Sequence, residues 1–304
     1  MKLLCLPDLH LTDSRPKERI DDYTETLKSK FLFILEIAKK ECDLILQPGD
    51  FMDSPSVSYD FLCWLIYYIK YCDIPIITTT GQHDLRYRNF ENTSLRTLSY
   101  SCDNLIILKG DGDIYKRKDH NVSVYSSPFN KEIPQIEKTL KKQFNILITH
   151  RMIVQEKIWA GQTDAESSNL FLRNNKFDLI VSGDNHQSFI QSHKGRYLIN
   201  CGSMMRSTIA QVDHKPFVVL FDTNEPDNFE IIKIPISVPK KVFDLQKKTD
   251  RKEIDANLDA FCNGLSKSKE MGLVIEDNLL EYYKENKIEK DLIEIIEENM
   301  HGIF

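Results

Sequence analysis

The chain has 304 residues, of which 41% are hydrophobic and 28% charged, and its formal net charge is -6. This composition supports one large domain or two domains and excludes an intrinsically disordered chain. The negative balance excludes a basic surface over the whole molecule but allows a local basic patch. The seven cysteines form no Cys-x-x-Cys pair, which favours reduced thiols over a disulfide framework. Because no stretch approaches the roughly 18 apolar residues of a membrane span, we expect a soluble cytoplasmic protein without membrane contact.

Short apolar runs alternate with amphipathic stretches through the first two thirds of the chain. Their periodicity predicts, in chain order, strand 3–6, helix 18–41, strand 43–46, helix 58–72, strands 74–80, 105–108 and 122–125, helix 131–142, strand 146–149, helix 165–174 and strand 179–182. From Gln187 onward the pattern predicts antiparallel strands at 188–192, 197–200, 217–222 and 229–234. Strand–helix alternation followed by a strand-rich half predicts an α/β fold with a mixed sheet or two facing sheets.

The composition changes after residues 235–241, which include two prolines. The segment that follows is rich in Lys and Glu, and two apolar stripes predict helices in it. The stripes are Ile254, Leu258, Phe261 and Leu265, then Ile288, Leu292, Ile295 and Ile296. We therefore predict a domain of residues 1–240 and a helical C-terminal region of residues 241–304. The stripes suit packing within the protein, and the alternative is a docking element for a partner protein.

Carboxylate, imidazole and amide side chains follow the predicted strands at the points where the strands end. In open α/β sheets the carboxyl ends of the strands are where ligands bind. Carboxylates and imidazoles suit divalent transition ions, and a carboxylate can bridge two of them. The set therefore predicts a hydrolytic site with two metal ions. Its members are Asp8, His10, Asp50, Gln82, His83, Asp84, His150, Asp184 and His186.

In this order the pieces resemble the motifs of the calcineurin-like metallophosphoesterases. The matching motifs are Asp8-x-His10, Gly49-Asp50-x-x-Asp53, Gly81-Gln82-His83-Asp84, Thr149-His150 and Gly183-Asp184-x-His186. The resemblance covers roughly residues 1–235 and implies a four-layer α/β/β/α sandwich of two mixed sheets with a small C-terminal helical appendage. Within the superfamily the chain is most similar to SbcD-type DNA-repair nuclease subunits. This similarity rests on the start directly at the first motif, on Asn200-Cys201-Gly202-Ser203, and on strands that lead into a short helical region.

The resemblance also implies roles for the individual residues. One ion would be held by Asp8, His10, Asp50 and His186, and the other by Asp50, Gln82, His150 and Asp184. His83 would orient the phosphate and protonate the leaving oxygen, steadied by Asp84. A hydroxide between ions about 4 Å apart is a nucleophile at neutral pH, and a histidine near its ordinary pKa can supply the proton. The expected ions are Mn²⁺, with Mg²⁺, Fe²⁺ or Zn²⁺ as alternatives.

Two positions depart from the family pattern, and both belong to the second ion. Gln82 stands where the family has Asn, and Asp184 stands where it has His. Gln keeps the amide oxygen but adds a methylene, and Asp replaces a nitrogen donor with an anionic oxygen that favours harder ions. We expect a working centre with a retuned second ion. The competing hypothesis is a weakened or lost second ion and little activity.

Cationic residues gather in the loops that follow the motifs, which suits a polyanionic substrate. Ordinary solvated loop charges are the alternative. The predicted substrate-binding residues are Arg15, Arg86, Arg88, Arg151 and Arg206. The leading hypothesis is therefore a DNA nuclease that works with an SbcC-like, SMC-type ATPase, and by resemblance also as a homodimer. The alternatives are a stand-alone nucleotide or protein phosphatase or phosphodiesterase, and a non-catalytic scaffold, against which the retained His83 argues.

Overall fold

The computed structural model describes residues 1–137, 143–156 and 165–244, together with Tyr283, Ile288 and Ile293. The chain divides into two compact units, Met1–Phe243 and Asp244–Phe304, and every element below belongs to the first. Apart from Ile288, the two predicted apolar stripes of the C-terminal region lie outside the described residues. No helix among the described residues is long and apolar enough to cross a membrane.

The first sheet has six strands in the order β14-β13-β1-β2-β3-β4. Their bounds are Lys2–Cys5 for β1, Leu44–Gln47 for β2, Ile76–Thr78 for β3, Leu105–Ile107 for β4, Phe217–Asp222 for β13 and Glu230–Lys233 for β14. Strands β1 to β4 are parallel, whereas β13 runs antiparallel to both β1 and β14. The sheet is therefore mixed, and the carboxyl ends of its four parallel strands share one edge.

The second sheet also has six strands, in the order β11-β12-β10-β7-β6-β5. Their bounds are Ile114–Arg117 for β5, Val122–Ser127 for β6, Phe144–His150 for β7, Leu179–Gly183 for β10, Phe189–His193 for β11 and Arg196–Asn200 for β12. The four central strands are parallel, and the edge strands β5 and β11 are antiparallel to their neighbours. Strands β8 (Ile153–Val154) and β9 (Glu166–Ser167) form a separate small parallel pair.

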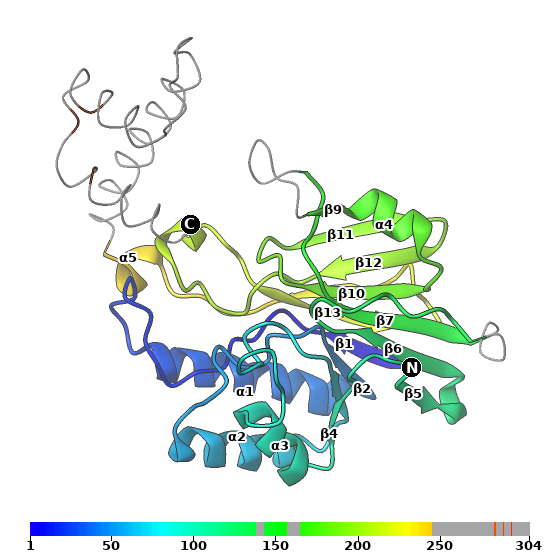
Figure 1. Ribbon diagram of the computed structural model, residues 1–304, viewed down its shortest axis with the longest axis horizontal. Coiled ribbons are helices and arrows are strands. Elements are labelled where there is room, and N and C mark those ends of the chain that lie inside the picture. Colours follow the sequence, from blue (N-terminus) through cyan, green and yellow to red (C-terminus); the bar gives the residue numbers. More distant parts are fainter. Residues whose placement is uncertain (138–142, 157–164, 245–282, 284–287, 289–292, 294–304) are drawn as a thin grey trace. The chain divides into compact units, whose positions relative to one another are not determined.

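Helices flank the two facing sheets (Figure 1). Helices α1 (Tyr23–Glu41), α2 (Tyr59–Cys72) and α3 (Ser94–Ser101) cover the first sheet, and α4 (Ser168–Asn174) packs against β11 and β12. Short helical turns lie at η1 (Lys118–His120), η3 (Ile209–Gln211) and α5 (Pro239–Val242).

Successive residues of β1 point to opposite faces, so Leu3 lies in the core between the sheets while Leu4 packs under the helices. The predicted sandwich of two mixed sheets with flanking helices is confirmed.

Local differences from the expected elements have physical causes. The predicted helix 131–142 is wrong over residues 131–137, which are not helical, because Pro134 removes a donor and clashes with the preceding turn; residues 138–142 lie outside the described residues. Helix α1 starts five residues later than predicted because the Asp22 carboxylate caps it by accepting from the Glu25 N–H. The periodicity did not predict β5 or the polar helix α3, which Thr93 caps.

Candidate metal centre

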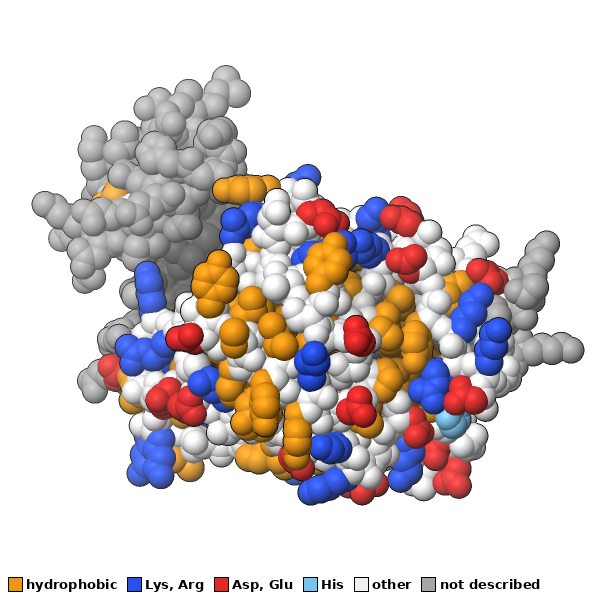
Figure 2. Space-filling model, turned by 90° about the horizontal axis from the view of Figure 1, so that it is seen from below, with side chains coloured by type: hydrophobic (Ala, Val, Ile, Leu, Met, Phe, Trp, Pro, Cys, Tyr) orange, Lys and Arg blue, Asp and Glu red, His pale blue; other side chains and the backbone are white. Residues whose placement is uncertain are grey.

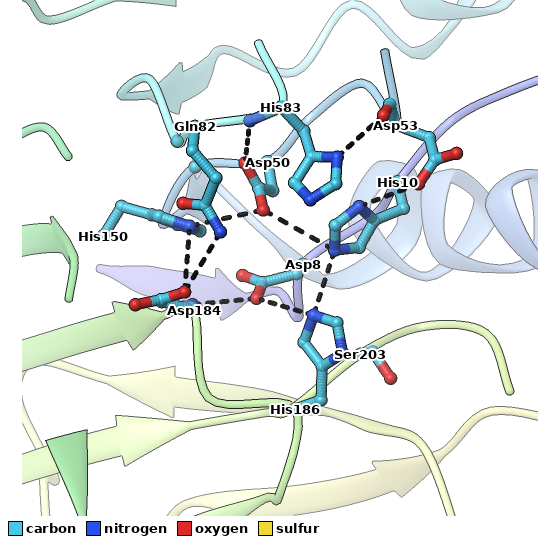
Figure 3. A network of polar contacts seen from close by, with 12 residues as sticks. Asp8, His10, Asp50, Asp53, Gln82, His83, His150, Asp184, His186 and Ser203 are labelled. Atoms are coloured by element: carbon cyan, nitrogen blue, oxygen red, sulfur yellow. Dashed lines mark hydrogen bonds and ion pairs between the residues drawn. The ribbon is translucent and has the colours of Figure 1, made fainter. Parts of the chain in front are cut away.

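The predicted site residues come together where strands of both sheets end (Figure 3). In the first sheet, Asp8 and His10 follow β1, Asp50 follows β2, and the segment Gln82–Asp84 follows β3. In the second sheet, His150 is the last residue of β7 and Asp184 comes directly after β10, two residues before His186. The carboxyl ends of parallel strands thus bring residues from distant parts of the sequence to one place.

The backbone turns sharply at three of these residues. His10, Asp50 and Asp184 have φ angles of 45°, 48° and 79°, in the left-handed region that residues with a side chain seldom adopt. Each such residue costs on the order of 1 kcal/mol or more and persists where the surroundings determine it. At Asp50, the backbone carbonyl accepts hydrogen bonds from the N–H groups of Leu9 and His10 at 3.2 and 3.0 Å. The two ligand-bearing loops therefore hold each other in place.

Glycines allow this close approach. A Cβ on Gly81 would lie 2.1 Å from Oδ1 of Asp50, and a Cβ on Gly183 would lie 2.3 Å from Oδ1 of Asp8. Neither glycine has a left-handed φ, so the requirement is for space and not for backbone freedom. Gly81 and Gly183 therefore leave the space that the carboxylates of Asp50 and Asp8 occupy.

Candidate ligand atoms converge in three overlapping groups, within each of which they lie no more than 4.8 Å from one another. The groups are Asp8, His10 and His186; Asp8, Asp50 and His150; and His10, Asp50 and His83. The Nε2 atoms of His10 and His186 are 3.0 Å apart, and Nε2 of His150 is 3.3 Å from Oδ2 of Asp50. Asp8, His10 and Asp50 each belong to two groups, so the three groups form one continuous cluster of candidate ligands that would hold neighbouring ions.

Several atoms of this cluster are buried without a hydrogen-bond partner. They are Oδ1 of Asp8 and Oε1 of Gln82, together with Oδ2 of Asp50 and Nε2 of His150, which form an ion pair with each other at 3.3 Å but no hydrogen bond. Buried polar atoms that lack a partner are costly and uncommon in folded proteins. Because all four are electron-pair donors of the kinds that bind divalent ions, the residues present fit such ions.

Two histidines are oriented by contacts to their second nitrogen. Nδ1 of His150 lies 3.0 Å from the carbonyl oxygen of Pro48, and Nδ1 of His10 lies 3.2 Å from Oδ1 of Asp53. A proton on Nδ1 of His150, donated to the Pro48 carbonyl oxygen, leaves Nε2 of that ring with a free electron pair, and the Asp53 carboxylate favours a proton on Nδ1 of His10 in the same way. In both residues Nε2 faces the cluster, which is how outer contacts prepare imidazole ligands for a metal.

Burial and neighbouring charges shift the pKa values of three residues of the site. Burial raises the pKa of Asp8 to about 7. Burial also acts to raise the pKa of Asp50, but the nearby His150 outweighs it and the pKa falls to about 2. For His150, burial acts to lower the pKa, but Asp50 outweighs it and raises the pKa to about 10. In the protein alone, a proton on His150 therefore balances the Asp50 carboxylate, and bound cations would take over that balance.

The two departures from the family pattern contact each other. Nε2 of Gln82 donates to Oδ1 of Asp184 at 3.1 Å, and the same oxygen lies 3.9 Å from Nε2 of His150. The extra methylene of Gln82 thus brings its amide to the carboxylate that replaces a histidine. Both side chains lie beside His150 (Figure 3), which is where the second ion is predicted.

His83 and Asp84 differ sharply in their surroundings. His83 is exposed, and its Nδ1 lies 2.8 Å from the carbonyl oxygen of Asp53, while its backbone N–H donates to Oδ1 of Asp50 at 2.9 Å. Asp84 is fully buried and accepts backbone N–H bonds from Gly81 and Met52 at 2.9 and 2.8 Å. Burial, followed by the charge of Asp50, raises the pKa of Asp84 to about 7. Asp84 therefore joins two loops, and Asp53, not Asp84, contacts the His83 ring.

Two residues of the site had no role in the sequence-based prediction. Asp53 belongs to the Gly49-Asp50-x-x-Asp53 motif, so its spacing was visible, but its contacts to both His10 and His83 depend on the turn at Asp50. Gln211 lies in η3, where Nε2 is 3.2 Å from Nδ1 of His186. No local pattern marks Gln211, because it reaches the site from a distant loop.

The five predicted arginines have different positions. Arg15, Arg86 and Arg88 are exposed, as a rim contact requires. Arg151 is partly buried and donates to Oε1 of Glu166 at 2.7 Å. Arg206 is only 3% exposed, and its guanidinium donates to the carbonyl oxygens of Val212 and Ser237. In this conformation Arg206 supports the loop, and the exposed members of the predicted set are Arg15, Arg86 and Arg88.

Comparisons with known proteins identify the family and agree with this fold. The chain belongs to the calcineurin-like phosphoesterase family, whose model matches residues 1–188. The family places the protein among hydrolases of phosphoester bonds that use divalent metal ions. No curated protein matches the chain.

Solved structures share the fold at low sequence identity. The crystal structure of TT1561 from Thermus thermophilus matches with a TM-score of 0.50 and 9% identity, covering 77% of this chain and 99% of that one. A second crystal structure matches with the same score and coverage at 10% identity. A novel archaeal phosphodiesterase matches with a TM-score of 0.41 and 14% identity over the same shares. At such identities the likeness to the first two structures concerns the fold alone.

Proposed function

We propose that this chain is a metal-dependent nuclease that cleaves DNA phosphodiesters, with an SbcD-like activity. The proposal rests on two hollows, each lined by metal-centre residues together with cations and carboxylates. The first, of about 430 Å³, is lined by Gln82 and by the cations Arg88, Lys109 and Lys131. The second, of about 790 Å³, is lined by Asp184 and His186 and by the cations Lys215 and Lys233.

The cations of the first hollow are available to a phosphate backbone. Lys109 lies 4.0 Å from Glu91, and Lys131 lies 3.2 Å from Asp111, with all four side chains about half exposed or more. Ion pairs in such positions contribute little stability, so phosphates can replace the carboxylates at small cost. The second hollow adds Phe217 and Ile231, apolar side chains against which a nucleoside can pack. A polymer with phosphates on both sides of the cleaved bond suits this arrangement better than a small monoester.

The residues divide the chemistry between them. When bound, the metal ions supply a nucleophilic hydroxide and neutralise charge on the phosphoryl oxygens. Asp8, His10, Asp50 and His186 would hold one ion, and Asp50, Gln82, His150 and Asp184 the other. The exposed His83 ring stands beside these ligands, with its centroid 4.9 Å from that of His10. Held through Nδ1 by Asp53, His83 can donate a proton from Nε2 to the leaving oxygen.

The proposal extends to metal identity and partners. Mn²⁺ is the expected ion, because Asp184 adds an oxygen donor to a mixed nitrogen and oxygen set. An SbcC-like ATPase is the proposed partner, with residues 241–304 as its docking element. Co-purification of the full chain with candidate ATPases is the direct check of that association.

The test compares linear DNA with a small aryl phosphodiester in the presence of Mn²⁺. We expect the wild-type protein to degrade linear DNA and His83→Ala to abolish degradation while still binding Mn²⁺. His120→Ala, in η1 at the amino end of β6, is the matched control and should remain active. Cleavage of the small diester with DNA left intact would favour the stand-alone phosphodiesterase. Failure to hydrolyse either substrate with two ions bound would overturn the proposal.

A further inference from the structure

His186 differs from the other predicted histidine ligands in what faces the second nitrogen of its ring. Oxygen atoms face Nδ1 of His10 and Nδ1 of His150. Nδ1 of His186 instead lies 3.2 Å from Nε2 of Gln211, an amide nitrogen that only donates hydrogen bonds. In the neutral ring this contact is a hydrogen bond if Nδ1 accepts, which places the ring proton on Nε2. Nε2 is the nitrogen that faces the other ligands, 3.8 Å from Oδ2 of Asp8.

The orientation of the Gln211 amide is fixed by its own partners. Oε1 accepts from the backbone N–H groups of Ser207 and Thr208 at 2.7 and 3.2 Å, and Gln211 belongs to the capping box at the start of η3. Nε2 also lies 3.4 Å from Oγ of Ser203, which donates its own proton to the Met205 carbonyl oxygen and so accepts from the amide. A rotated amide would turn its N–H groups towards two backbone donors, so the observed orientation is strongly favoured.

The loop that carries Gln211 is anchored to the rest of the domain. At its beginning, the Met204 N–H donates to the backbone carbonyl oxygen of Asp8 at 2.9 Å. At its end, buried apolar side chains form a small cluster of Ile209, Val212, Val242 and Phe243. Withdrawal of Gln211 from the metal centre would disturb these contacts, so the amide is a permanent neighbour of the His186 ring.

In the protein alone, four side chains form one continuous run of polar contacts. Nε2 of Gln211 donates to Nδ1 of His186, and Nε2 of His186 then donates to Nε2 of His10 at 3.0 Å (Figure 3). His10 can accept there because the Asp53 carboxylate, 3.2 Å from Nδ1 of His10, favours a proton on that nitrogen. Each ring thus carries one proton, and His186 presents an N–H where a metal ligand needs an electron pair.

We infer that Gln211 is a positioning residue that weakens binding of the first ion, because it holds His186 with the ring proton on Nε2. To offer Nε2 as a ligand, His186 must release that proton to solvent and take one up on Nδ1, so the ring stays neutral. Nδ1–H would then face the N–H of Gln211, and one hydrogen bond becomes a contact between two donors. The occupancy of the first site should therefore follow the supply of free divalent ions. The inference rests on the proposed metal centre.

The first experiment locates the ring proton of His186 in the metal-free chain. In protein labelled with nitrogen-15 at histidine, chemical shifts at about pH 8, above the ordinary pKa of histidine, distinguish a protonated ring nitrogen from one with a free electron pair. The spectrum of His186→Gln assigns the signals. We expect the proton on Nε2 in the wild type and on Nδ1 in Gln211→Glu, whose carboxylate accepts from it. A wild-type proton on Nδ1 would overturn the inference, whether or not the site binds metal.

The second experiment titrates Mn²⁺ into the wild type and Gln211→Glu in a calorimeter. Glu is a usual member of a capping box, so the variant should keep the loop in place. One of the two binding events should tighten by about tenfold or more, because a carboxylate behind an imidazole ligand raises metal affinity. Equal affinities of the two proteins for both ions would overturn the inference. Absence of Mn²⁺ binding in both proteins would instead overturn the metal centre, and this role of Gln211 with it.

Two control variants separate the contact with the His186 ring from the effect of added charge. Gln187→Glu adds a carboxylate at the exposed residue directly after His186. Thr97→Glu adds one at an exposed position of α3, on the side of the molecule where Figure 2 shows both acidic and basic side chains. Both variants should keep the wild-type ring proton and bind Mn²⁺ with close to wild-type affinity. A gain in Gln187→Glu as large as that in Gln211→Glu would assign the effect to charge and overturn the inference.

Discussion

Oδ1 of Asp53 lies 3.2 Å from Nδ1 of His10. The backbone carbonyl oxygen of the same residue lies 2.8 Å from Nδ1 of His83. Asp53 thus contacts both a predicted metal ligand and the predicted proton donor through two different groups. The side chain contacts His10 and the backbone contacts His83, so a substitution of the side chain can separate the two functions.

Asp53→Asn should weaken metal binding while leaving His83 in place. The substitution removes the negative charge that faces Nδ1 of His10 and leaves only a weaker amide acceptor there, and weakening of such an outer contact lowers metal affinity by about 10- to 100-fold. Titration calorimetry with Mn²⁺ measures the change. Asp111→Asn, which removes an exposed carboxylate paired with Lys131, is the control and should bind Mn²⁺ normally. Equal affinity in both variants would show that Asp53 does not position His10.

Gly81→Ala should abolish metal binding and lower the thermal midpoint. Its new Cβ would lie 2.1 Å from Oδ1 of Asp50, so the carboxylate or the loop must move. Gly195→Ala is the comparison, because its Cβ meets nothing within 4 Å although its φ is 71°. That change should cost only about 1 kcal/mol of backbone strain and leave Mn²⁺ binding intact. A Gly81→Ala protein that binds Mn²⁺ like the wild type would contradict the packing described for Asp50.

Substitution of the exposed Arg88 and of the buried Arg206 should have different effects. Arg88→Gln should leave the free energy of unfolding unchanged within about 0.5 kcal/mol and should weaken DNA binding. Removal of one phosphate contact should also reduce the salt dependence of binding by about one unit of slope. Arg206→Gln should instead destabilise the protein, because it removes buried hydrogen bonds to the carbonyl groups of Val212 and Ser237. Chemical denaturation and DNA titration at several salt concentrations distinguish the two effects.

Lys30 provides a pH-dependent contribution to stability away from the metal ligands. Burial, followed by the charges of Arg206 and Arg19, lowers the pKa of Lys30 from 10.5 to about 7. Between these two pH values the unfolded chain binds one proton more than the folded chain, so the free energy of unfolding rises with pH. Below pH 7 both states carry the proton, and the burial of the charge is fully unfavourable.

Lys30→Met should therefore stabilise the protein most near pH 6, by on the order of a few kcal/mol, and progressively less towards pH 10. Denaturation of both proteins across this range checks the sign and the window. The single hydrogen bond that the variant loses, from Nζ to the Met204 carbonyl oxygen at 3.2 Å, is small beside that effect. If the difference in free energy of unfolding between the wild type and Lys30→Met does not change with pH, folding does not lower the pKa of Lys30.

The sequence predicted the strand ends well because the chemistry there is local. An apolar run followed by a turn and a polar residue places Asp8, Asp50 and His150 without knowledge of the rest of the chain. Periodicity predicted an α/β fold with a mixed sheet or two facing sheets, and the family resemblance implied the two-sheet sandwich. Periodicity failed in the segment expected to be helical, where Pro134 overrides it, and it did not predict β5 or α3. The left-handed backbone at Asp50 could not be predicted, since it depends on the loop that carries His10.

Contacts between distant segments explain what sequence reasoning missed. Arg206 has the pattern of a rim residue, but Val212 and Ser237 surround it only after folding. Gln211 reaches His186 from a separate loop, and Asp53 contacts His83 through its backbone, which no side-chain pattern reveals. Periodicity distinguishes buried from exposed positions on one element, whereas these contacts depend on how several elements meet.

We expect the metal centre to bind two divalent ions despite the presence of Gln82 and Asp184. Elemental analysis of the purified chain, equilibrated with saturating Mn²⁺ and freed of unbound metal, counts these ions. The wild type should hold two Mn²⁺ ions per chain, and Asp50→Ala, which lacks the shared carboxylate, should lose both. Fewer than two ions per wild-type chain under these conditions would rule out the two-ion centre.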